Sequence, residues 1–252
     1  MKFVLIAIVS LLYAVHVRCQ VQFEWTSEEF KGKVKSVEET LLHKYARDEK
    51  KPWSKTTTFY DSEGRITRSI LQFYYQDSWG GGIHTDYWYS SGKLAGFKEY
   101  QPGNDTDFRE HVIVKWSSNG REATATYKNE KNEIQYIYVH KFDGAGKEFE
   151  MTVGPDKPPL ITKFVYDNAG RKTAENSNTS ERPNGATRPE KQTFFYGVDN
   201  LPLVCKGFSD GMTMVQRWEY NKFDDHGNWT NRTESIDIGG TSFTERKFIY
   251  YE

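Results

Sequence analysis

The sequence is poor in cysteine, which rules out a disulfide-stapled fold. It has two cysteines among 252 residues, and one of them, Cys19, ends an apolar N-terminal segment. Cys205 alone cannot form an internal disulfide, so packing and hydrogen bonds must hold the fold together. Because Cys205 lies in the apolar run LPLVCKGF, we expect a buried small hydrophobe there rather than a catalytic nucleophile.

The sequence also has no excess of positive charge, since it contains 34 basic and 35 acidic residues. This balance argues against a nucleic-acid partner. The chain has no G-x-S-x-G, no H-E-x-x-H and no phosphate-binding glycine loop. We expect no cofactor and no metal, because the histidines that follow the N-terminal segment show no metal-ligand spacing.

Long hydrophobic runs are rare, and the one that stands out opens the chain, from Phe3 to Val15. It follows Lys2 and precedes Val17-Arg18-Cys19, which is typical of a secretory signal peptide over residues 1–19. A retained membrane anchor is the alternative interpretation. Cleavage after Cys19 would remove two basic residues and leave 32 basic and 35 acidic ones, a net charge of −3. We therefore expect a secreted protein, extracellular or, in a bacterium, periplasmic or on the outer surface, without a further membrane span.

Aromatic residues, by contrast, reach 15%, and many of them introduce a short repeated phrase. The phrase is an aromatic residue, two or three small or polar residues, a glycine and a polar residue, as in YDSEGR (60–65) and YDNAGR (166–171). It recurs in steps of 24 to 30 residues at Gly64, Gly92, Gly120, Gly146, Gly170, Asn200 and Gly227. Such regularity indicates a repeat array.

The chemistry of the phrase predicts a β-hairpin turn. Asp61 and Asp167 can accept hydrogen bonds from N–H groups inside a type I turn, and the glycine can take the positive φ that the following bulge requires. The fold class is then all-β: an antiparallel meander of about seven hairpin repeats, with a period of about 27 residues, curled into a spiral, a barrel or two layers. We expect a lead-in segment at residues 20–55 and the repeat domain at residues 56–252.

These phrases resemble those of the YD-repeat (RHS-repeat) family over residues 56–251, and residues 30–45 resemble the lead-in strand of small secreted members from Bacteroidetes-type bacteria. For the large members of the family, the resemblance implies a spiral β shell around a toxin or an adhesive extracellular rod, and glycan binding has often been proposed. This chain is too short for a shell around cargo, and it lacks an Asp-Pro pair. We therefore do not expect encapsulation or autoproteolysis.

The segment from Phe73 to Tyr89 is the strongest candidate for a ligand site. Gly80, Gly81 and Gly82 predict either a flexible loop tip or a close approach of the backbone to another group. Aromatic faces beside hydrogen-bonding groups suit stacking on sugar rings, although such rings also commonly cover the faces of a thin sheet. The candidate ligand-binding residues are Trp79, His84, Asp86, Tyr87, Trp88 and Tyr89.

In a eukaryotic source, Asn104 and Asn178 would be the best glycosylation acceptors among the N-x-[ST] sequons.

We expect a secreted, non-enzymatic binding protein that recognises an extracellular glycan or a partner protein through its repeat surface. The alternatives are a glycosidase-like enzyme, whose two acids need only meet in space, and an immunity or accessory protein paired with a secreted toxin.

Overall fold

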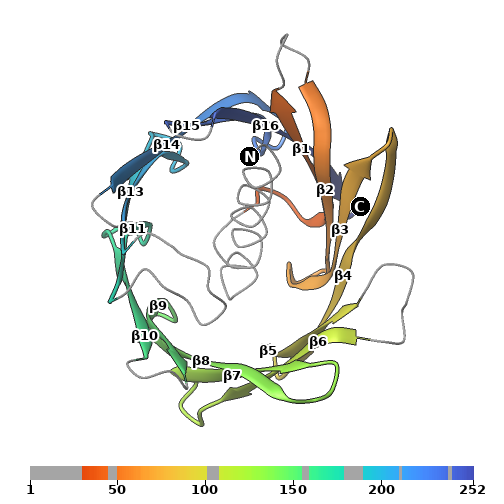
Figure 1. The fold of residues 1–252 in the computed structure, drawn as a ribbon. Helices are drawn as coiled ribbons and strands as arrows, with labels where there is room; N and C mark the ends of the chain where they lie inside the picture. The colour runs from red at the N-terminus through yellow and green to blue at the C-terminus, as the bar shows by residue number, and fades with distance from the viewer. Residues whose placement is uncertain are drawn as a thin grey trace.

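Figure 1 shows the computed structural model of the chain. It describes residues 30–44, 50–100, 108–154, 159–178, 190–209, 212–237 and 240–252. The predicted signal peptide at residues 1–19 and the predicted acceptor Asn104 lie outside the described residues. No helix in the described part of the chain is long and apolar enough to cross a membrane.

All regular structure in the described residues is β, in sixteen strands. The strands are β1 (Val34–Lys44), β2 (Lys50–Tyr60), β3 (Ile66–Tyr75), β4 (Ser78–Ser90), β5 (Lys93–Tyr100), β6 (Phe108–Trp116), β7 (Glu122–Asn129), β8 (Ile134–Phe142), β9 (Glu148–Gly154), β10 (Leu160–Tyr166), β11 (Lys172–Ser177), β12 (Lys191–Tyr196), β13 (Pro202–Ser209), β14 (Met212–Phe223), β15 (Trp229–Ile236) and β16 (Gly240–Tyr250). The all-β prediction is confirmed.

Each strand pairs antiparallel with its neighbours in sequence, and the first strand also pairs with the last, so the sheet closes into a barrel (Figure 1). The pairing of β1 with β16 runs from Val34 opposite Tyr250 to His43 opposite Ser242. Of the three forms predicted for the curled meander, the structure adopts the barrel. The predicted lead-in segment is part of it, because residues 34–44 and 50–55 belong to β1 and β2.

Side chains alternate between a covered face and an open face along the strands. On β7, Ala123, Ala125 and Tyr127 are buried, whereas Thr124 and Thr126 between them are partly exposed. Side chains converge on the concave side of a closed sheet and splay apart on the convex side, so the covered set faces inward. We call these two sides the concave face and the convex face.

The concave face holds the core. Its main apolar cluster spans β5, β6 and β7 and contains Leu94, Phe97, Val112, Val114, Ala123, Ala125 and Tyr127. Elsewhere this face is polar but paired: Arg246 contacts Glu39 at 2.7 Å, and the Trp218 indole donates to Glu234 at 3.0 Å. A wide ring of strands cannot fill its interior with apolar side chains alone, and pairs of this kind satisfy polar groups that face it.

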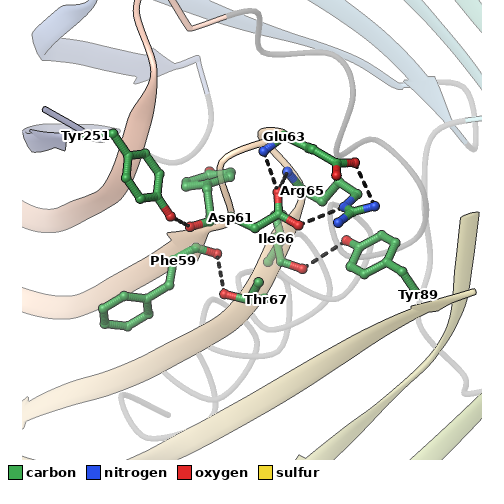
Figure 2. A network of polar contacts seen from close by, with 9 residues as sticks. Phe59, Asp61, Glu63, Arg65, Ile66, Thr67, Tyr89 and Tyr251 are labelled. Carbon is green, nitrogen blue, oxygen red and sulfur yellow. Dashed lines mark hydrogen bonds and ion pairs between the residues drawn. The ribbon is translucent and has the colours of Figure 1, made fainter. Parts of the chain in front are cut away.

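The repeated phrase forms the predicted hairpin turn. In the copy at residues 60–65, the Asp61 Oδ1 atom accepts from the N–H groups of Glu63 and Arg65, both at 2.9 Å (Figure 2). Gly64 has a φ of +80° and donates its N–H to the Asp61 carbonyl at 3.0 Å. Partial burial of the Asp61 carboxyl acts to raise its pKa. The hydrogen bonds from Arg65 and Glu63 together outweigh this effect, so the pKa is lowered.

The other copies follow the same plan. Asp167 accepts from Arg171 at 2.9 Å, as Asp61 does from Arg65. The positions aligned with Gly64 all have positive φ: Gly92, Gly120, Gly146, Gly170, Asn200 and Gly227. The seven turns join β2 to β3, β4 to β5 and so on to β14 and β15, which gives fourteen of the sixteen strands. The copy YSSGK departs from the plan, since Ser91 and Gly92 both have positive φ in a two-residue turn.

The basic residue and the aromatic residue of the phrase connect successive hairpins. The Arg65 guanidinium lies 5.0 Å from the ring centroid of Tyr89, and the Tyr89 hydroxyl donates to the carbonyl of Ile66 at 2.9 Å (Figure 2). Three further hairpin contacts repeat this arrangement: Lys93 with Trp116 and Leu94, Lys147 with Tyr166 and Glu148, and Arg171 with Tyr196 and Lys172. The phrase thus encodes both a turn and the contact to the next turn.

Both ends of the described chain meet in an arrangement that resembles one more turn. The Tyr251 N–H donates to the Lys33 carbonyl at 2.9 Å, as the Asp61 N–H donates to the Arg65 carbonyl. Gly32 has a φ of +85°, the conformation of the phrase glycines. The Tyr251 hydroxyl also donates to the carbonyl of Tyr60 at 2.6 Å (Figure 2). The junction of β16 with β1 therefore reuses the repeat geometry with residues from both ends.

The glycines at positions 80–82 do not form a loop tip, so that alternative is wrong. The tip of the β3–β4 hairpin is at Gln76 and Asp77, both with positive φ. Gly82 lies inside β4 with a φ of +119°, and a Cβ there would stand 1.8 Å from the Leu71 carbonyl oxygen. The close approach that the glycines also predicted is made to the neighbouring strand, at a β-bulge.

Candidate functional site

The predicted ligand-binding residues lie on both faces of the sheet. Tyr87 and Tyr89 point to the concave face, where Tyr87 packs on Phe97 with ring centroids 5.5 Å apart. Burial raises the pKa of both phenols. The Tyr89 hydroxyl donates its hydrogen bond to the preceding hairpin, at Ile66. Both rings therefore stabilise the fold and are not available to a ligand on the convex face.

The remaining four residues lie on the convex face. Trp79 is near the tip of the β3–β4 hairpin, where its ring meets Tyr74 edge-on at 5.1 Å and Lys55 Nζ lies 5.0 Å from its centroid. His84, Asp86 and Trp88 follow at alternate positions of β4. Trp79 is separated from them by the bulge at Gly82, so it forms a contact group of its own.

Trp88 has the ring that is best placed to meet a ligand. It is 36% exposed and lies opposite Gly96 of β5, where a Cβ would stand 2.3 Å from the indole atom Cζ2. Because Gly96 has no side chain, the Trp88 indole can pack flat against the sheet at this position. The His111 ring of β6 is 5.8 Å away, measured between centroids, so neighbouring side chains hold the exposed ring in place.

Polar groups surround Trp88 on the convex face. Arg68 of β3 binds both carboxylate oxygens of Asp86, at 2.6 and 3.2 Å. His84 stacks on Tyr100 of β5 at 4.5 Å with an interplanar angle of 25°. We call the group of His84, Asp86, Trp88, Tyr100 and His111 the convex aromatic cluster.

The surroundings of His111 favour its uncharged form. Partial burial, and then the charges of Lys98 and Lys128, lower its pKa. Lys98 lies between Asp86 and His111 in the same cross-strand row. The cluster therefore offers a flat ring, two imidazoles and an ion pair, which is a set of groups for recognition by stacking and hydrogen bonding.

The sequence pointed to three members of this cluster and missed two, Tyr100 and His111. Both lie on strands next to β4, at positions that the hairpin register brings beside His84 and Trp88. Counting back from the turn at Gly92 could have paired β4 with β5 and found Tyr100. His111 could not be found in this way, because residues 101–107 separate β5 from β6 without a copy of the phrase.

Two side chains with reactive groups, Cys205 and His140, are buried. Cys205 is buried, and burial, followed by the charge of Glu175, raises its pKa to about 12. His140 contacts Glu148 at 2.6 Å, but the His140 side chain has no exposed area. No group of three or more potential metal ligands gathers in the described parts of the chain.

The sequons differ in availability. Asn178 is exposed, and its amide is fixed by two hydrogen bonds, accepting from Ile161 N–H at 2.7 Å and donating to the Pro159 carbonyl at 2.8 Å. Asn228 is buried, and its amide nitrogen donates to Lys31 and Tyr250. Of these two, Asn178 remains the acceptor that a glycosyltransferase could reach.

Comparisons with known proteins place this chain in no family. No protein-family model matches it, and no curated protein matches it. Among solved structures, 28 chains match. One of them, described as "Crystal Structure of TcdB2-TccC3-TEV", shares 12% sequence identity over 76% of this chain, with a TM-score of 0.34. This chain spans about a tenth of that protein's length, 11%, and the similarity is too weak to support an argument about function.

Proposed function

We propose that this protein is an extracellular binding protein without enzymatic activity, and that it recognises a glycan through the convex aromatic cluster. The observation that carries the proposal is the Trp88 indole, 36% exposed and held flat on the sheet over Gly96. An extracellular site of action is supported by the signal-like residues 1–19.

A sugar fits this surface better than a purely apolar ligand. One face of a pyranose ring carries C–H groups that pack on an indole, while its hydroxyls need hydrogen-bond partners at the edge of the contact. Asp86 retains acceptor capacity beside its ion pair with Arg68, because a carboxylate has about four lone-pair sites. A ring that is already fixed loses little conformational entropy on binding, which favours affinity.

Recognition also fits the surroundings of the cluster better than catalysis. Asp86, the carboxylate next to Trp88, is engaged by two guanidinium nitrogens of Arg68, and the cluster contains no second carboxylate to complete a glycosidase pair. Membership of the YD-repeat family is part of the same proposal. It is supported by the six phrase copies that form positive-φ glycine turns.

A glycan-array screen with protein from Gln20 onward tests the proposal. Selective binding should be lost in Trp88→Ala and kept in Tyr75→Ala, which removes a ring that is 72% exposed but lies outside the cluster. Circular dichroism would verify that both variants fold. His111→Ala, which removes only an edge of the cluster, provides a second variant if Trp88→Ala is unstable. Silence of the wild-type protein across the array would refute glycan recognition and direct attention to a protein partner.

A further inference from the structure

A second part of the convex face combines exposed lysines with exposed apolar side chains. Lys163 of β10, Lys191 of β12 and Lys206 of β13 are all exposed. Among the described residues, no acidic side chain forms an ion pair with any of the three. Some convex-face cations elsewhere are paired, for example Lys55 with Glu38 and Arg68 with Asp86.

The strand register places these lysines close together. Lys163 and Lys191 lie in one cross-strand row with only Asn176 between them, so their Cα atoms are about 10 Å apart. Lys206 lies opposite Thr193. Thr193 is two positions from Lys191 on β12, a distance of about 7 Å along the strand. Three positive charges therefore lie within a small area of the convex face.

Apolar side chains lie between these charges. Val165 and Phe195 are each 46% exposed and Phe208 is 43% exposed. Phe208 is directly opposite Lys191, and Lys206 Nζ lies 5.3 Å from the ring centroid of Phe195. We call the six residues Lys163, Val165, Lys191, Phe195, Lys206 and Phe208 the basic wall.

Two carboxylates near the basic wall are bound to other cations. Glu150 stands opposite Lys163, but its carboxylate is bonded to Lys141 at 2.8 Å. Asp237 is held by Arg217 at 2.6 Å. The wall therefore keeps a local positive charge on a protein whose overall charge is −1, and this local excess calls for an anionic partner.

We propose that the basic wall binds an anionic polysaccharide, with carboxylate or sulfate groups on the lysines and sugar faces on Phe195 and Phe208. An extended polymer suits the wall because the cations follow a row across the strands, at a spacing comparable with that of charged groups on alternate sugars. The two rings give a sugar a stacking surface that a simple polyanion does not use. The inference rests on the proposed function in that the ligand is a glycan, but it uses a separate surface.

Binding of defined polymers tests the inference. The probes are heparin, which carries sulfates, and polygalacturonate, which carries carboxylates, with neutral dextran and polyglutamate as controls. At about 0.15 M salt the wild-type protein should bind heparin or polygalacturonate but neither control, and added salt should weaken binding. The polymer that binds distinguishes sulfate from carboxylate recognition.

Two triple variants with the same change of charge locate the site. Replacing Lys163, Lys191 and Lys206 by Gln should raise the Kd by roughly tenfold or more, since three charge contacts are lost. The matched control replaces Lys115, Lys222 and Lys247 by Gln, three exposed lysines outside the wall, and should leave the Kd within about twofold. Equal losses in both triples, equal binding of polyglutamate, or no binding of either anionic polysaccharide would overturn the inference.

The two proposals fail independently of each other. Trp88→Ala should leave binding to heparin or polygalacturonate unchanged, because Trp88 lies on β4, away from β10–β13. Loss of anionic binding in Trp88→Ala, with the lysine triple unaffected, would assign that binding to the convex aromatic cluster and overturn the basic wall. Neutral glycan binding by the wild-type protein, together with no binding of either anionic polysaccharide, would leave the proposed function standing alone.

Discussion

Replacement of the turn glycine Gly64 by valine measures how much the repeated phrase contributes to stability. Gly64 has a φ of +80°, and no atom lies within 4 Å of the position of a new Cβ. The cost is therefore one of backbone conformation and not of steric contact with neighbours. A side chain in this region costs about 1–2 kcal/mol, and a β-branched one somewhat more.

A smaller term opposes this cost. Loss of glycine reduces the conformational freedom of the unfolded chain, which favours the variant by about 0.4–1 kcal/mol. The net destabilisation should be roughly 1–2 kcal/mol. For a domain of this size the Tm should then fall by roughly 2–8 °C, because each kcal/mol shifts it by about 2–4 °C.

Thermal unfolding followed by circular dichroism provides the assay, and Gly80→Val is the matched control. Gly80 is also open within 4 Å of a new Cβ but does not have positive φ, so its replacement should leave the Tm nearly unchanged. Gly64→Asn should cost less than Gly64→Val, because Asn200 occupies the equivalent position at a φ of +61°. An unchanged Tm in Gly64→Val would refute the structural role of the phrase.

Four further outcomes are expected. Tyr251→Phe removes the hydrogen bond to the Tyr60 carbonyl at 2.6 Å and should lower the free energy of unfolding by about 1 kcal/mol in urea titrations; no change would argue against this closure contact. Gly82→Ala places a Cβ 1.8 Å from a backbone oxygen, so it should lower the Tm more than Gly64→Val does, and an equal or smaller effect would contradict the bulge. Cys205 is buried with its pKa raised to about 12; it should react with a thiol reagent at pH 8 only after denaturant is added, and rapid reaction of the native protein would contradict its burial. Burial lowers the pKa of His43 despite the opposing charge of Glu234, so the unfolded state binds the proton more readily and stability should fall as the pH drops through about 6.5; His43→Gln should show a smaller fall between pH 7.5 and 5.5 in the same thermal assay, and an equal fall would exclude His43 as a source.

The local chemistry of the chain was readable from the sequence. An Asp three positions before a Gly can satisfy its hydrogen bonds within six residues, as Asp61 and Gly64 do, so the turn depends on nothing distant. Alternation along each strand is equally local, because successive side chains point to opposite faces of any sheet. For this reason the all-β meander and its seven phrase turns could be predicted before the structure was known.

Closure and the composition of the sites depend on contacts between residues far apart in sequence. Nothing near Tyr251 in the sequence indicates that its N–H will meet the carbonyl of Lys33. The division of Tyr87 and Trp88 between two faces follows from their neighbouring positions, but which face is concave depends on how all sixteen strands curl. The basic wall likewise exists only after β10, β12 and β13 are aligned, because register, and not sequence distance, brings Lys163, Lys191 and Lys206 together.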